Sequence, residues 1–98
     1  PSPECQADIQ AILDEFAHRE GSPVLFHGVR ARVAGHVQHV AFHVLVPGTW
    51  TVTQGHDLLE EIEGRFHGKF GHIVVDTHLE PIEDPRSYDA PQWESASP

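Results

Sequence analysis

In the stretch VLFHGVRARVAGHVQHVAFHVLVPG, residues 24–48, apolar and polar side chains alternate along two successive runs. The first run sets Val29, Ala31 and Val33 against two arginines, Arg30 and Arg32. Such alternation is typical of a β-strand with one buried face. The second run alternates in the same way and would bury Val40, Phe42, Val44 and Val46. Because Ala34-Gly35 separates the two runs, the stretch predicts a β-hairpin.

A helical pattern precedes the hairpin. From Pro3 to about Arg19 the apolar residues recur at helical spacing, which predicts an amphipathic helix. Ser2 is suited to cap its start, and Gly21 is suited to stop it. The buried stripe of this helix would consist of Ile9, Ile12, Leu13 and Phe16.

A second helix and a third strand follow the hairpin. Pro47-Gly48 ends the second strand, and Thr53 is the expected N-cap of a helix with His56 on the side of its apolar stripe. That stripe would consist of Leu59, Ile62 and Phe66. Residues 72–81, HIVVDTHLEP, predict a strand that runs parallel to the previous one, because a helix connects them.

The element order is therefore α-β-β-α-β. We expect an α+β domain in which two helices cover one face of a three-stranded mixed sheet, and the open face suggests a partner. This domain would span residues 1–83. Residues 84–98 are polar, contain three prolines and lack periodicity, so they predict a flexible tail with Trp93 as its one candidate anchor.

The composition of the chain argues against several classes of function. The chain has 98 residues and a formal charge of −9, from 15 acidic and 6 basic residues, which argues against binding to nucleic acid. It has no long apolar run and no secretion signal, so we expect a soluble chain. A single cysteine, Cys5, excludes an intramolecular disulfide and favours a reducing compartment.

Nine histidines are the most unusual feature. Four of them lie at element ends or on inward-looking faces of four different segments, and Glu80 shares a strand face with the last; the five residues are His27, His43, His56, His78 and Glu80. Imidazole nitrogen and carboxylate oxygen from separate elements suit a tetrahedral zinc-like ion, and Co, Ni or Mn also fit.

The residues alone leave this reading open. The chain has no local metal-binding motif, and each of these histidines has an ordinary explanation, such as a hydrogen bond to a backbone carbonyl or a solvated strand end. We expect the remaining five to be structural or solvated: His18, His36, His39, His67 and His72.

The element order, together with FHGVRARVAG, HVAFHVLVPG, TVTQGHDLLEEIEGRF and VVDTHLEP, resembles the C-terminal cytoplasmic domain of cation diffusion facilitator transporters. The resemblance covers roughly Pro3 to Glu83. It implies a ferredoxin-like, metallochaperone-type fold that forms a homodimer and regulates the transmembrane domain of the same protein, on the cytoplasmic side of the membrane. We do not expect an enzyme, because the sequence shows no separate pocket or nucleophile motif.

Carried over residue by residue, the metal ligands of that family fall on the same five residues, His27, His43, His56, His78 and Glu80. The resemblance implies Zn²⁺, with Mn²⁺, Co²⁺, Ni²⁺, Cd²⁺ or Fe²⁺ as alternatives. Two departures bear on the number and identity of the ions. Zinc-transporting relatives often have an acidic residue where this chain has Gly28, and they often close with an aspartate in place of Glu80.

Three functions follow as hypotheses. The main one is a metal sensor that captures a divalent cation at the dimer cleft and favours a closed dimer, which activates transport by an attached membrane domain. The second is a free-standing cytosolic metal buffer or metallochaperone with the same ligands. The third and weakest is a small zinc hydrolase, in which a glutamate would act as base on metal-activated water.

Overall fold

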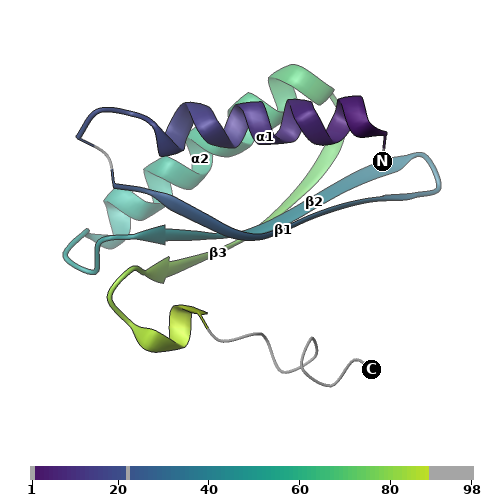
Figure 1. The fold of residues 1–98 in the computed structure, drawn as a ribbon. Coiled ribbons are helices and arrows are strands. Elements are labelled where there is room, and N and C mark those ends of the chain that lie inside the picture. Colours follow the sequence, from purple (N-terminus) through teal and green to yellow (C-terminus); the bar gives the residue numbers. More distant parts are fainter. Residues whose placement is uncertain (1, 22, 89–98) are drawn as a thin grey trace.

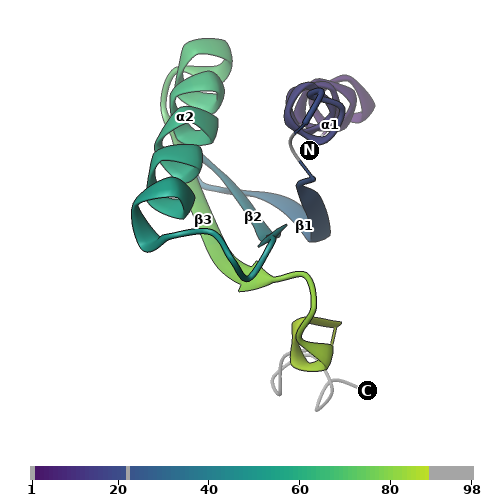
Figure 2. The same cartoon turned by 90° about the vertical axis from the view of Figure 1, so that its left-hand side faces the viewer.

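The computed structural model describes residues 2–21 and 23–88, and in these the predicted element order is confirmed. Both helices lie over one face of the sheet (Figure 1), and a 3-10 helix lies on the opposite side (Figure 2). The predicted α+β class, with two helices on one face of a three-stranded sheet, is therefore confirmed. In chain order the elements are α1 (Pro3–Ala17), β1 (Leu25–Ala34), β2 (Val37–Val46), α2 (Val52–Phe70), β3 (Ile73–Pro81) and the 3-10 helix η1 (Pro85–Tyr88).

The central strand of the sheet is β2, which pairs antiparallel with β1 and parallel with β3. We call the side away from the helices the open face. Paired residues of neighbouring strands share a face, and successive residues alternate between faces. The register therefore assigns to the open face Leu25, His27, Arg30, Arg32, Ala34, Val37, His39, Ala41, His43, Leu45, Val74, Asp76, His78 and Glu80.

A β-bulge interrupts β1 between His27 and Arg30. Gly28 lies in the bulge with a φ of +61°, a conformation that residues with a Cβ atom rarely adopt. The sequence pattern had placed Val29 and Val33 among the buried residues, and this expectation is wrong, because Val29 falls in the bulge and Val33 lies next to the hairpin turn. Their exposed fractions are 38% and 53%.

The core lies between the helices and the sheet. Phe42 of β2 is at its centre, with its ring centroid 5.8 Å from Phe26 and 5.7 Å from Phe66 of α2. The predicted stripe of α1 is buried as expected. In α2, Ile62 and Phe66 are buried as predicted, but Leu58 is buried in place of the predicted Leu59, which is only partly buried. The helix is therefore rotated slightly from the predicted phase.

Each helix begins at a defined N-cap. Ser2 caps α1 as predicted, since its hydroxyl accepts a hydrogen bond from the Cys5 amide at 3.0 Å. The cap predicted at Thr53 is wrong, because α2 begins two residues earlier at a capping box. There the Thr51 hydroxyl accepts from the Gln54 amide at 3.1 Å, and the Gln54 side chain accepts from the Thr51 amide at 2.8 Å.

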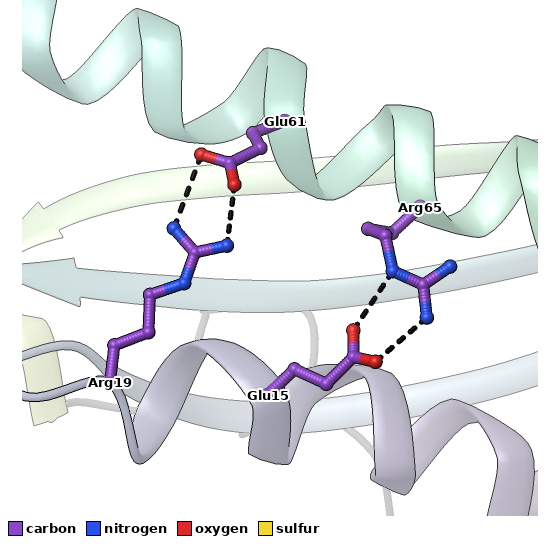
Figure 3. A network of polar contacts seen from close by, with 4 residues as sticks. All are labelled: Glu15, Arg19, Glu61 and Arg65. Carbon is purple, nitrogen blue, oxygen red and sulfur yellow. Dashed lines mark hydrogen bonds and ion pairs between the residues drawn. The ribbon is translucent and has the colours of Figure 1, made fainter.

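Two charge pairs join the helices across the top of the core (Figure 3). Arg65 of α2 donates to both carboxylate oxygens of Glu15 at 2.8 and 2.9 Å, and Arg19 donates to both oxygens of Glu61. We call these four residues the bracket. Hydrogen bonds from the guanidinium groups lower the pKa of Glu15 and of Glu61. The bracket fixes α1 against α2 through surface groups.

No helix in the described part of the chain is both long and apolar enough to cross a bilayer.

Candidate metal centre

Three of the five predicted ligands lie at the same level on three adjacent strands. His27 of β1 pairs with His43 of β2, and His43 pairs in turn with His78 of β3. Because paired residues share a face, all three positions belong to the open face. The sheet thus brings together histidines that are separated by 16 and 35 residues in the chain, as their numbers 27, 43 and 78 show.

Two of these histidines and Glu80 form a compact group, which we call the His43 cluster. The rings of His43 and His78 approach edge to face with centroids 5.3 Å apart. Nδ1 of His43 lies 3.3 Å from Oε2 of Glu80. The side chains of His43 and Glu80 are only 14% and 28% exposed. A cation bound here would therefore exchange much of its hydration shell for protein ligands.

The donor atoms of the His43 cluster fit a zinc-like ion. Two donors that each lie ~2.0–2.2 Å from one tetrahedral ion are ~3.3–3.6 Å apart. The 3.3 Å between Nδ1 of His43 and Oε2 of Glu80 agrees with that separation. The chemistry also agrees, since neutral imidazole and carboxylate are the ligands that Zn²⁺ accepts when thiolates are absent.

His27 does not join the cluster. Its ring packs instead against Tyr88 of η1, with centroids 5.2 Å apart and an interplanar angle of 59°. The β-bulge begins directly after His27, and bulges commonly redirect a neighbouring side chain.

His56 lies elsewhere. It belongs to the first turns of α2, and its side chain is 66% exposed and 3.7 Å from the carboxylate of Glu60. The expectation that it shares the side of the buried stripe is wrong, because that stripe runs through Gly55, Leu58, Ile62 and Phe66. Helix α2 also covers the face of the sheet opposite to the His43 cluster (Figure 2).

Among residues 2–21 and 23–88, no three His, Cys, Asp or Glu side chains are arranged to hold a metal ion. The His43 cluster is therefore an incomplete coordination set within one chain. A full tetrahedral shell requires ligands that move or that come from another molecule.

Sequence reasoning missed Asp76. It lies two residues before His78 on the same face, and the spacing Asp-x-His-x-Glu over residues 76–80 would have revealed it. A surface cavity of about 350 Å³ lies beside the His43 cluster, lined by Arg30, Ala41, Phe42, His43, Asp76, Thr77 and His78. This cavity combines imidazole, carboxylate and guanidinium groups.

The structure also differs from the prediction just after β3. Residues 85–88, which the sequence assigned to a tail without structure, form η1. Arg86 binds both carboxylate oxygens of Asp84 and thereby lowers the pKa of that aspartate. The sequence pattern missed η1 because a single 3-10 turn is too short to produce periodicity. The predicted anchor Trp93 lies outside the described residues.

Comparisons with known proteins identify a family and several similar chains. Residues 1–82 match the family described as the cytoplasmic domain of cation efflux proteins. An uncharacterized transporter of Synechocystis sp., sll1263, is 47% identical over 85 residues, which are 87% of this chain and 27% of the transporter. The chain thus spans only about a quarter of that relative's length.

Solved structures show the same fold. The zinc form of CzrB superposes with a TM-score of 0.74 at 28% identity, covering 86% of this chain and 92% of the CzrB chain. The cytosolic domain of a cation diffusion facilitator family protein gives a TM-score of 0.68 at 26% identity, with coverages of 83% and 93%.

Proposed function

Because the chain belongs to the family of cytoplasmic domains of cation efflux proteins, the cation diffusion facilitators, we propose that it is a metal-sensing dimerisation domain of a divalent-cation transporter. Residues 1–83 form the sensing unit in this proposal. It works on the cytoplasmic side of the membrane, binds Zn²⁺ or a similar cation, and regulates the transmembrane part of the same protein.

One observation carries this proposal. Nδ1 of His43 and Oε2 of Glu80 are separated by the distance expected for two ligands of one tetrahedral ion, and the ring of His78 lies directly beside them. The side chains of His43 and Glu80 are partly buried, whereas His78 is exposed on the open face. Ordinary surface histidines would not require such a grouping across two strands.

A second copy of the chain would complete the coordination set. The His43 cluster lacks enough ligands within one chain, whereas the predicted ligand His56 faces solvent on α2. An exposed ligand on one copy and an incomplete set on the other are what a site at a dimer cleft requires. We therefore assign His43, His78 and Glu80 to one subunit of each site and His56 to its partner.

The ion would act by shifting a conformational equilibrium. With a formal charge of −9, two copies repel one another, which favours an open arrangement. A divalent cation that contacts both subunits binds the closed arrangement more tightly and so increases its population. Closure would then be transmitted to the attached transmembrane part.

Calorimetric titration of the metal-free protein with Zn²⁺ and Mn²⁺ near neutral pH tests the site. The double variant His78→Ala, Glu80→Ala loses two ligands, so we expect its zinc affinity to fall by at least about tenfold. A matched control is His36→Ala, which removes an exposed imidazole in the hairpin turn. This control should bind like the wild type.

If the double variant and the wild type bind zinc equally, the His43 cluster is not the site. If His36→Ala weakens binding as much as the double variant does, zinc binds to surface histidines without a defined centre.

A further inference from the structure

Residues 84–88, which we call the strap, follow β3 and lie outside the region matched by the family, which ends at residue 82. The strap is held by several hydrogen bonds. The Ser87 hydroxyl donates to the carbonyl of Pro81 at 2.6 Å, and the Tyr88 hydroxyl donates to the carbonyl of Ile82 at 2.8 Å. Ser87 is buried, although it is polar. The strap is therefore a folded element.

The strap lies on the open face of the sheet, away from the helices (Figures 1 and 2). Leu45 provides an independent sign that this end of the face is covered. Its side chain belongs to the open face and takes no part in the core beneath the helices, yet it is completely buried. The root of the strap is also fixed, because Glu83 accepts from the Gly48 amide at 2.9 and 3.2 Å.

Tyr88 links the strap to His27. The two rings are in contact, while the hydroxyl at the far end of the phenol is fixed by Ile82. His27 and His43 are directly paired, and the Cβ atoms of such a pair lie only ~4.5–5.5 Å apart. The imidazole of His27 is thus anchored within reach of the His43 cluster, but its ring is packed on Tyr88.

We propose that the strap is a gate on the metal centre. In the docked state Tyr88 holds the His27 ring away from His43, His78 and Glu80. When the strap undocks, the His27 ring turns toward the cluster and adds a fifth ligand to the four assigned above, a coordination number that zinc accepts. Metal capture through His27 and docking of the strap therefore exclude one another, so the docked strap weakens apparent metal affinity. This inference rests on the proposed metal centre.

The test compares zinc affinity, measured by titration against a chelator, in the full chain and in Tyr88→Ala. Aromatic pairs of this kind are modest in energy, so we expect the variant to bind zinc about threefold to tenfold more tightly. Tyr88→Phe keeps the ring contact and should bind much closer to the wild type. In a His27→Ala background, Tyr88→Ala should leave the zinc affinity unchanged, because the gate acts only through His27.

Tyr88 is the only tyrosine in the chain, so its ring signals in an NMR spectrum need no further assignment. Zinc should shift these signals and abolish the cross-relaxation between the rings of Tyr88 and His27. Unchanged or weaker zinc binding in Tyr88→Ala, or the same gain in the His27→Ala background, would overturn the gate and leave the metal centre standing. Absence of zinc binding in every variant, including the wild type, would overturn both.

Discussion

Gly28 is the residue on which the shape of the candidate metal centre depends most. Its φ of +61° creates the bulge after His27, and an added Cβ atom would lie 3.4 Å from Cδ2 of His43. An aspartate or a glutamate at this position would therefore be strained in this backbone. Gly28 instead permits the bulge in β1 beside the His43 cluster.

We expect Gly28→Ala to lower the free energy of unfolding by about 1–2 kcal/mol, because an L-residue at positive φ is strained. Urea denaturation measures this directly. Gly64→Ala is the matched control: Gly64 lies in α2 with open space around its Cβ position, and alanine there should stabilise by about 0.5–1 kcal/mol. Equal stability of Gly28→Ala and the wild type would show that the bulge tolerates a side chain.

At this scale the sequence predicts the face of a strand residue better than the face of a helix residue. The shared face of His43, His78 and Glu80 was predictable because strand alternation fixes the face of each side chain once one buried neighbour is known. The face predicted for His56 was wrong because a helix rotates ~100° per residue, so an error of one residue in the stripe moves a side chain to another surface. No sequence pattern predicts the contact between Tyr88 and His27. The two residues are 61 positions apart, and Tyr88 lies in a single 3-10 turn, which is too short to produce periodicity.

At the scale of elements, the bracket connects the two helices that lie over the sheet. Glu15 and Arg19 face Arg65 and Glu61, with each acid opposite a base (Figure 3). All four side chains are about half exposed, so each pair contributes modestly and is sensitive to salt. Because each acid is paired with a base of the other segment, the bracket favours one alignment of the two helices. The buried apolar stripes beneath it supply most of the stabilisation.

The lowered pKa of Glu15 and of Glu61 gives the bracket a defined pH dependence. A carboxylate whose pKa falls on folding stabilises the fold fully above its unfolded value, here 4.5, and loses this effect as pH falls through the lowered pKa. We expect the double variant Glu15→Gln, Glu61→Gln to be less stable than the wild type at neutral pH and to approach it in acid.

Urea denaturation at a series of pH values in low salt tests this prediction. Glu20→Gln serves as the control, because it removes a carboxylate outside the bracket. A stability difference between the double variant and the wild type that stays constant from neutral pH into acid would rule out a contribution from the charged pairs.

The element order and the pairing of the strands followed from the sequence because alternation, helical spacing and a helical crossover leave few alternatives. The caps were less certain, since Thr51 and Thr53 are equally good capping residues by type. Only Thr51 has Gln54 three positions later, and this reciprocal pair sets where α2 begins.

For the whole molecule, the central feature is a sheet with one face under helices and one face that carries the candidate metal centre. The His43 cluster, Asp76 and the neighbouring cavity gather on that face, and the strap covers one end of it. In our proposal a second copy supplies the missing ligand and the cation offsets the repulsion between two acidic chains. Sequence alone could not predict this, because ligand geometry between two chains leaves no periodic pattern.

Sedimentation velocity of the metal-free and zinc-loaded protein, over a range of protein concentrations, shows whether zinc closes or joins two copies. We expect zinc to increase the dimer population, or to make an existing dimer sediment faster at unchanged mass, and we expect His56→Ala to abolish this response. A wild-type protein whose mass and sedimentation rate stay the same when zinc is bound would contradict this expectation.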